Sequence, residues 1–498
     1  MKTYKFKKVI FLTISMILLG FVGCKKFLQE DARNFINPGT FYQSQADAEG
    51  GIAGIYQTFN IGTGEGLANI LTELNSINSD FTWPWSMTAY EVGYNVTPDF
   101  YFCNNSWAIC YDGIKRANSF IDAIEAANPI EPVNVKNRQI GEAKFLRSLF
   151  YFYLVQIFGD VPLITKTYIS SDNFFVTRDS TAVVWRFVKS DLLDAINLLP
   201  HKSAYSGSDI ARPNQESAKM LLAKIYMIQN DWPNAKQYVD KIIASNEYQL
   251  VTNVFDNYRI AKKHGIESIF EVDYASGYIP SLGSTLFKLT MPANLICPLT
   301  GKPMGGAWAG VAFSPDFYNS FDAGDQRLQL FFTPGTYVAP VGRYFTNKYF
   351  DPTVMTISAD CPVNWVVFRY ADVLLMKAEI ENELNAGPNA AAYDAIDMVR
   401  VRANLAPLAR VLDYNGFLDA VFTERAKELF AETHRFFDLK RRGYTFLVNK
   451  VLPARLALFN YIGFSGPFVI KESELVWPIS TQEMDVNPKL VQNPGYGY

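Results

Sequence analysis

The chain has 498 residues, and its 46 Lys and Arg against 49 Asp and Glu leave a formal net charge of only −3. This near balance, with no basic stripe, argues against nucleic acid as a partner. Aromatic residues reach 15%, a content that points to ligands with flat apolar faces, such as sugars. Apart from Cys24, the cysteines are sparse and lack C-x-x-C spacing, so they do not indicate a disulfide framework: Cys103, Cys110, Cys297 and Cys361.

The N-terminus reads as an export signal. Four lysines within the first eight residues precede an apolar run over 9–22, whose length of about 14 residues falls short of a membrane span and suits a secretory signal. Phe-Val-Gly-Cys at 21–24 resembles a bacterial lipobox, in which the cysteine is lipidated. We predict a signal peptide over 1–23, lipidation of Cys24 and a tether over 24–34; the alternative is a secretory signal with an incidental cysteine.

Helical periodicity follows along the chain. Helices are predicted over 46–59, 107–126 and 137–158, and 182–199 is the expected partner of the third. In 216–243, two apolar stripes flank Asn-Asp-Trp-Pro, which predicts a helical hairpin whose second helix begins near the proline. The order Asn-Asp-Trp-x-x-Ala resembles the turn of a tetratricopeptide repeat.

The pattern resumes after a long interruption. A second hairpin is predicted from 369–385 and 389–404, and 415–442 is expected to form one long charged helix. The fold predicted is mainly α, with tetratricopeptide-like hairpins in a right-handed solenoid and a few short strands such as 268–272. Within a domain over 35–498, the helical frame takes about 35–59, 106–247 and 366–443, and irregular insertions take about 60–105, 248–365 and 444–498. Long irregular stretches of this kind are usually functional.

Several blocks resemble the SusD/RagB family of nutrient-binding outer-membrane lipoproteins of Bacteroidetes. They occur in family order: 142–147 (EAKFLR), 158–163 (FGDVPL), 369–375 (RYADVLL), 424–439 (ERAKELFAETHRFFDL) and 487–496 (NPKLVQNPGY). The resemblance implies a lipid-anchored protein at the cell exterior that binds oligosaccharides, or in some members peptides. It also implies delivery of the ligand to a SusC-like TonB-dependent barrel transporter, and no enzymatic activity.

The acidic block at 424–438 is better explained by packing than by catalysis. Glu424, Glu428 and Glu432 follow one another at i+4 steps and share one helical face, where Arg425 and Arg435 could pair with them or with neighbouring helices. Gly159 ends a helix, and Asp322, Asp325 and Arg327 are expected to order a helix–loop junction. The three histidines have no metal-ligand spacing, so no metal and no cofactor is expected.

A ligand site is predicted where rings crowd the insertions. Residues 80–94 (DFTWPWSMTAYEVGY) carry Trp83, Trp85 and Tyr94, with Asn78 and Asp80 as possible partners for hydroxyl groups. Pro84 keeps this segment out of a helix interior. Trp308, flanked by glycines in 301–310, is the second candidate, and Tyr278, near Tyr274 and before Pro280, is the third. The alternative is that these rings fill the core of the insertions.

Four functions follow from these features. The favoured one is a surface lipoprotein that captures oligosaccharides for a barrel transporter. The same architecture with a peptide ligand should show more charge and fewer stacked rings. A helical scaffold without a small ligand would explain the hairpins but leave the aromatic insertions unexplained. A hydrolase would need a pair of carboxylates across the scissile bond, which the sequence does not single out.

Overall fold

The computed structural model describes residues 42, 44–60, 66–84, 96–126, 132–167, 174–277, 282–297, 299–304, 308–334, 337, 342–353, 361–462 and 468–497. The chain divides into two compact units, Met1–Gln43 and Ser44–Tyr498, and all the elements named here belong to the second. None of the described helices combines the length and hydropathy that crossing a membrane requires. The predicted signal, Cys24 and the tether lie outside the described residues.

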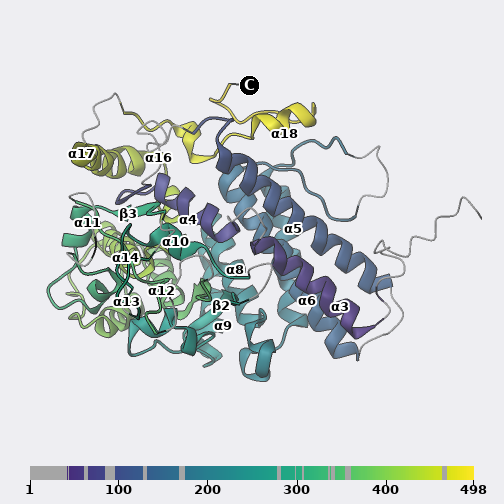
Figure 1. Ribbon diagram of the computed structural model, residues 1–498, viewed down its shortest axis with the longest axis horizontal. Helices are drawn as coiled ribbons and strands as arrows, with labels where there is room; N and C mark the ends of the chain where they lie inside the picture. The colour runs from purple at the N-terminus through teal and green to yellow at the C-terminus, as the bar shows by residue number, and fades with distance from the viewer. Residues whose placement is uncertain are drawn as a thin grey trace, which may run out of the picture. The chain divides into compact units, whose positions relative to one another are not determined.

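Helices form the frame, and each packs on the next. α3 (Gln45–Tyr56), α5 (Tyr101–Ala126) and α6 (Val133–Phe158) lie side by side (Figure 1). α6 also packs on α7 (Thr181–Leu198). These elements confirm the helices predicted over the first part of the chain, and at the end of α6 Gly159 has the positive φ of 73° that its predicted role requires.

The next pair is the predicted hairpin of α8 (Gln215–Ile228) and α9 (Trp232–Ala244). Asn214 caps α8 by accepting hydrogen bonds from amides of its first turn. Asn230 turns the chain with a φ of 56°, a conformation that Asn tolerates better than most residues, and the side chain of Asp231 caps α9. Ala235 is fully buried, which permits close approach of the two helices.

The chain leaves this stack after α9 and returns at α12 (Tyr370–Leu384), which packs directly on α9. α12 in turn packs on α13 (Ala390–Arg402) and α14 (Tyr414–Leu429), so the second predicted hairpin continues the stack. The structure is therefore mainly helical, as predicted. Inside the excursion, β2 (Ser268–Val272) pairs antiparallel with β4 (Trp365–Arg369), which ties the insertion to the start of α12.

The insertions contain more regular structure than expected. The helix α4 (Leu67–Ile77) lies in the first insertion, and only Glu73 of its residues is not buried. Its apolar residues have helical spacing, so the signal for this helix was present in the sequence. The other α-helices and strands described in the insertions are α17 (Leu452–Ile462) and six short ones: β1 (Thr82–Pro84), α10 (Leu286–Thr290), β3 (Val311–Phe313), α11 (Pro315–Asn319), α16 (Tyr444–Phe446) and α18 (Thr481–Val486).

The single long helix predicted over 415–442 is wrong. The chain breaks between α14 and α15 (Arg435–Arg441), where Ala431 and Thr433 have positive φ angles of 62° and 65°. The break exposes carbonyls to buried donors: the Glu428 carbonyl accepts hydrogen bonds from the side chains of Lys348 and Arg369. Cations thus satisfy the C-terminal end of α14, where the helix dipole favours positive charge.

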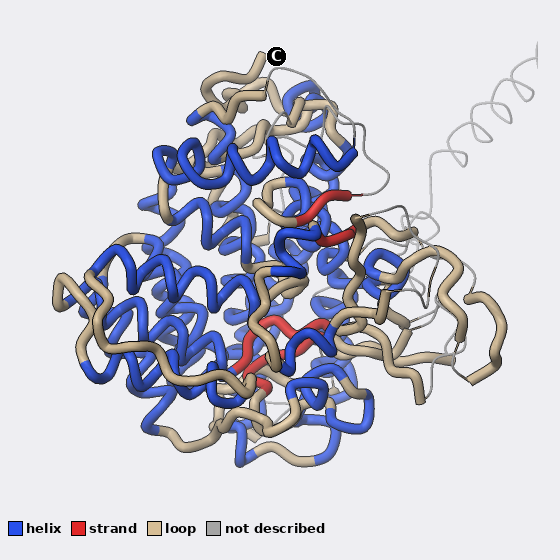
Figure 2. Tube along the Cα trace, turned by 90° about the vertical axis from the view of Figure 1, so that its left-hand side faces the viewer, coloured by secondary structure: helices blue, strands red, loops and turns tan. Residues whose placement is uncertain are grey.

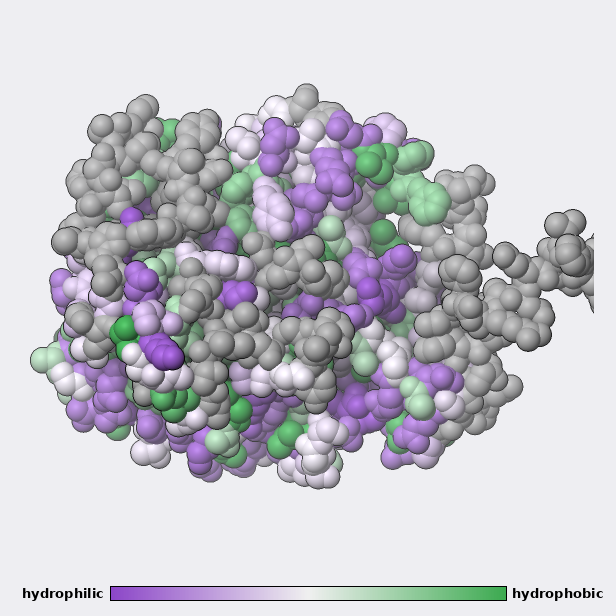
Figure 3. All heavy atoms as spheres, viewed as in Figure 1, coloured by the Kyte–Doolittle hydropathy of each residue, from purple (hydrophilic) through white to green (hydrophobic). Residues whose placement is uncertain are grey.

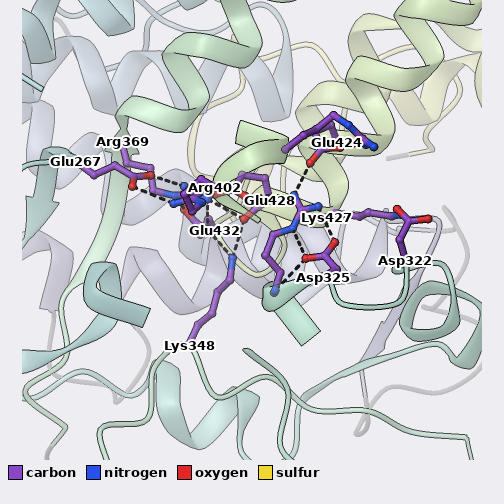
Figure 4. Close-up of polar contacts among 12 residues, drawn as sticks. Glu267, Asp322, Asp325, Lys348, Arg369, Arg402, Glu424, Lys427, Glu428 and Glu432 are labelled. Carbon is purple, nitrogen blue, oxygen red and sulfur yellow. Dashed lines mark hydrogen bonds and ion pairs between the residues drawn. The ribbon is translucent and has the colours of Figure 1, made fainter. Parts of the chain in front are cut away.

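A buried ion network lies at this break, and it confirms the predicted pairing of the acidic block (Figure 4). The Arg369 guanidinium donates hydrogen bonds to carboxylates of Glu267 at 2.7 Å, Glu428 at 2.5 Å and Glu432 at 2.7 Å. Arg402 also bonds Glu267 and Glu428. Burial alone raises the pKa of Glu428, but the charges of Arg402 and Arg369 outweigh it and hold that pKa well below its usual range.

The network reaches into the large insertion as well. Lys348 bonds Glu432 at 2.6 Å, and Arg327 bonds Glu424 at 2.6 Å. Arg327 also bonds Asp325, which caps the turn after it, so the predicted helix–loop junction is confirmed and joined to α14. All these carboxylates are buried, and their charges are therefore unscreened by water.

We predict that Arg369→Met lowers the free energy of unfolding by about 3–5 kcal/mol, because it leaves buried carboxylates without their cation. Chemical denaturation measures the loss. Arg410→Met is the matched control: Arg410 is half-exposed and pairs with the exposed Asp394 and the buried Asp397, so its loss should be clearly smaller than that of Arg369→Met. Equal losses in the two variants would contradict the central role of the network.

Candidate ligand-binding site

The two aromatic segments predicted to bind ligand are brought together by one strand pair. β1 pairs antiparallel with β3, with Trp83 opposite Ala312 and Pro84 opposite Val311. Figure 2 shows the described strands in red, short and enclosed by helices and loops. Trp308 lies four residues before Ala312 on the chain leading into β3. The segment of Trp83 and the segment of Trp308 therefore meet, although they are far apart in the sequence.

A buried aromatic cluster packs against this strand pair. Phe81 stacks on Phe317 with ring centroids 3.9 Å apart, and Phe313 of β3 lies 5.3 Å from Phe430, edge to face. Phe331 stacks on Phe430 at 4.8 Å. These five rings belong to one hydrophobic core cluster. Part of the aromatic surplus thus fills the core of the insertions, as the alternative interpretation expected, and it fixes the backbone of β1 and β3.

Two arginines from the C-terminal part of the chain hold the β1 segment. Arg435 donates two hydrogen bonds to the Asp80 carboxylate, at 2.8 and 2.5 Å, and its guanidinium carbon lies 5.3 Å from the centroid of the Phe81 ring. Arg455 of α17 is fully buried and donates to the carbonyls of Thr82 at 2.8 Å and Ser76 at 3.2 Å. Two arginines therefore anchor the chain that leads into Trp83.

Trp308 is held at its backbone and partly exposed at its ring. Its amide donates to the Lys288 carbonyl at 2.8 Å, and the Lys288 ammonium lies 5.2 Å from the ring centroid. The side chain is 37% exposed. Position 310 requires a glycine, because a Cβ there would lie 2.2 Å from the Leu289 side chain of α10. Close packing of the backbone on α10 thus presents the Trp308 ring at the surface.

Comparison with known proteins identifies the family to which this architecture belongs. A family profile described as "SusD family" matches residues 334–496, and one described as "Starch-binding associating with outer membrane" matches residues 29–227. A SusD-like protein of Formosa agariphila is 28% identical over 96% of this chain and 98% of its own length. The chain belongs to the SusD/RagB family.

Solved SusD structures share the fold. A SusD superfamily protein of Parabacteroides distasonis aligns with a TM-score of 0.75 and 25% identity, over 91% of this chain and 99% of that one. A laminarin-binding SusD-like protein aligns with a TM-score of 0.75 and 26% identity, over 91% of this chain and all of that one. The starch-binding protein SusD of Bacteroides thetaiotaomicron is 31% identical, over 29% of this chain and 25% of its own length.

The predicted site residues of this SusD-family chain have different positions. Asn78 is fully buried and donates to the Leu74 carbonyl, and Asp80 is bound by Arg435, so each has a structural contact, and ligand binding by either stays a prediction. Trp83 is described through its backbone in β1. Tyr274, beside the third candidate, is buried. The other predicted residues lie outside the described part of the chain: Trp85, Tyr94 and Tyr278.

An open hollow in the large insertion was not predicted. It measures about 670 Å³ and is lined mainly by rings and apolar side chains, with Arg259 beside the ring of Phe255 at 4.6 Å. Phe331 lines it and also belongs to the cluster under β3, so the hollow adjoins the base of the strand pair. Sequence could not reveal it, because its lining comes from residues spread between 255 and 352.

Groups suited to metal binding were also sought. Among the described residues, no three His, Cys, Asp or Glu side chains are grouped as metal ligands. Cys103, Cys110, Cys297 and Cys361 are buried and, within the described residues, form no disulfide.

We predict that Asp80→Ala loosens β1. It removes both hydrogen bonds to Arg435 and leaves this guanidinium half-buried without its carboxylate, at a cost of about 1–3 kcal/mol. Hydrogen exchange should rise in peptides covering 80–83 and 311–313. Asp394→Ala is the matched control, because Asp394 is exposed and pairs with the half-exposed Arg410 on the frame, away from both strands. Unchanged exchange in both segments would show that Asp80 does not anchor the strand pair.

Proposed function

We propose that this protein is a lipid-anchored outer-membrane protein, facing the cell exterior, that captures oligosaccharides and delivers them to a SusC-like TonB-dependent barrel transporter. The binding site combines Trp308 with the rings of the β1 segment, Trp83 and Trp85, and with Tyr94 and Tyr278. Trp308 supplies a flat apolar face for the C–H face of a sugar ring. We propose binding without turnover.

One observation carries this proposal: the β1–β3 pair joins the two tryptophan-bearing segments on a rigid base and leaves the Trp308 ring partly exposed. A ring whose backbone is already fixed loses little conformational entropy when a sugar stacks on it. The family supports the ligand class, since one relative is called laminarin-binding and another starch-binding. Both named ligands are glucans, so soluble glucan oligosaccharides are the first to be tried.

We predict that Trp308→Ala weakens binding of the preferred oligosaccharide at least about tenfold, a loss of about 1.4 kcal/mol, because a stacking face is removed. Isothermal titration with starch-derived and laminarin-derived oligosaccharides, and with a peptide mixture, measures the affinity and identifies the ligand class. Trp232→Ala is the control, since Trp232 is also a partly exposed tryptophan but lies on α9 of the frame.

Unchanged oligosaccharide affinity in Trp308→Ala would remove this residue from the site. Binding of peptides in place of every oligosaccharide would replace the proposed ligand class. Release of reducing ends during incubation would overturn the proposal of binding without turnover. The three outcomes are distinct, so each part of the proposal is tested separately.

We predict that Cys24→Ala abolishes the lipid anchor. The wild-type protein should partition with outer membranes and yield an N-terminal peptide with the mass of a lipidated cysteine. The variant should leave the membrane fraction while it still binds oligosaccharide, because the folded unit begins after Gln43. Membrane association that survives in Cys24→Ala would show that another contact holds the protein.

A further inference from the structure

A second hollow lies on other elements than the site of Trp308. It measures about 390 Å³ and opens between α5, the segment that follows α6, and the C-terminal segment with α18. Trp107, Tyr111 and Ile114 of α5 line one side, and Ile164 and Leu490 line the others. Ligand sites typically have volumes of roughly 300–1,000 Å³ and mostly apolar linings. The hollow therefore has the size and composition of a small-molecule site.

The wall after α6 is fixed by polar side chains from the frame. Asn118 donates to the Ile164 carbonyl at 2.9 Å, and Tyr151 both donates to that carbonyl at 3.0 Å and accepts from the Ile164 amide at 2.7 Å. Asp122 accepts a hydrogen bond from the Thr167 amide at 2.9 Å. Because Asn118 and Asp122 belong to α5, these bonds fix the position of this segment relative to that helix.

The opposite wall is also cross-linked. Arg178 donates to the Val491 carbonyl at 2.6 Å and to the Asn493 side chain at 2.5 Å. Asn487 donates to the Val176 carbonyl at 2.9 Å. The hydrogen bonds therefore fix the walls of the hollow relative to one another. Protein interiors are normally close-packed, so a hollow of this size with fixed walls is preformed for an occupant.

The rim is apolar and carries positive charge. Phe174 and Val486 are 64% and 66% exposed, and Figure 3 shows hydrophobic side chains exposed at the upper right, on the side of α18. Lys115 and Lys166 are exposed and belong to the lining; within the described part of the chain, neither forms an ion pair. The lining contains one carboxyl group, that of Glu483, and partial burial raises its pKa.

From this geometry we propose that the hollow binds a small amphipathic organic anion, with its apolar body between α5 and Leu490 and its anionic group at Lys115 and Lys166. Its rings and aliphatic side chains suit an aromatic or acyl body. The two lysines suit a carboxylate or sulfonate. An oligosaccharide is a poor match for a lining so rich in aliphatic groups, so this site differs in ligand class from the surface around Trp308.

The test uses two fluorescent probes with similar apolar bodies: anilinonaphthalene sulfonate, which is an anion, and phenylnaphthylamine, which is neutral. The chain carries Cys24→Ala throughout, so that no lipid and no detergent competes for the probes. We expect saturable binding of both at one site. Ala108→Trp, from an exposed alanine of α5 in the lining, should fill the hollow and weaken both probes at least tenfold.

Two further variants are measured with both probes for comparison. Ala391→Trp, at an exposed alanine of α13, should leave both affinities unchanged. The double variant Lys115→Gln, Lys166→Gln should weaken the anionic probe at least fivefold and leave the neutral probe unchanged.

The proposal falls if neither probe saturates, or if Ala108→Trp behaves like Ala391→Trp. It also falls if the lysine variants affect both probes alike or neither. If Ala108→Trp abolishes association with another protein while probe binding is unchanged, the hollow is a protein-docking surface and the small-molecule proposal is overturned. Oligosaccharide titration of the same variants should show unchanged affinity, which separates this test from that of the glycan site.

Discussion

Buried charge pairing at Arg369 is the constraint on which the rest of this structure depends. Arg369 ends β4 immediately before α12, so it stands where the large insertion rejoins the helical frame. Its carboxylate partners are Glu267, just before β2, and Glu428 and Glu432, at and just after the end of α14. Lys348 and Arg327 join the insertion to Glu432 and Glu428. Apolar surfaces can slide past one another, but a buried ion network tolerates few arrangements. The position of the insertion on the frame is therefore set by charge.

That constraint extends to the ligand surface through a short series of contacts. The Lys348 ammonium lies 4.0 Å from the centroid of Phe430, and Phe430 stacks on Phe331 and meets Phe313 of β3. β3 continues from the segment that carries Trp308 and pairs with β1. The ion network and the phenylalanine cluster thus support the segment that carries the partly exposed Trp308. Such support suits recognition by stacking, which needs a fixed ring.

The helical frame could be predicted from the sequence because its signals are local. Asn214 and Asp231 cap the helices that they precede, and Gly159 ends the helix that precedes it. The break after α14 escaped prediction because its cause is not local: the carbonyls freed there are satisfied by Lys348 and Arg369 from distant parts of the chain. The helix α4 was missed for another reason: Leu67, Ile70 and Leu71 have helical spacing, but the glycines and aromatic residues around this stretch favoured an irregular insertion.

The candidate site was only partly predictable for the same reason. The sequence singled out the tryptophans, and it made Trp308 a candidate because glycines flank it. The pairing of β1 with β3 is tertiary, and so is the support from Arg435 and Arg455, whose own sequence surroundings say nothing of Asp80 or Thr82. Residues that bind are visible from their chemistry, whereas residues that position them become visible only when the fold is known.

The tie between Asp80 and Arg435 spans 355 residues of sequence. Contacts of such separation form late, since the intervening chain must first be ordered. The proposed export and anchoring signals lie in the first residues of the chain, while the supports of the β1 segment come from residues near its end. A chain cut short during synthesis would thus carry the proposed signals without the contacts that hold β1. The proposed ligand surface therefore depends on completion of the whole polypeptide.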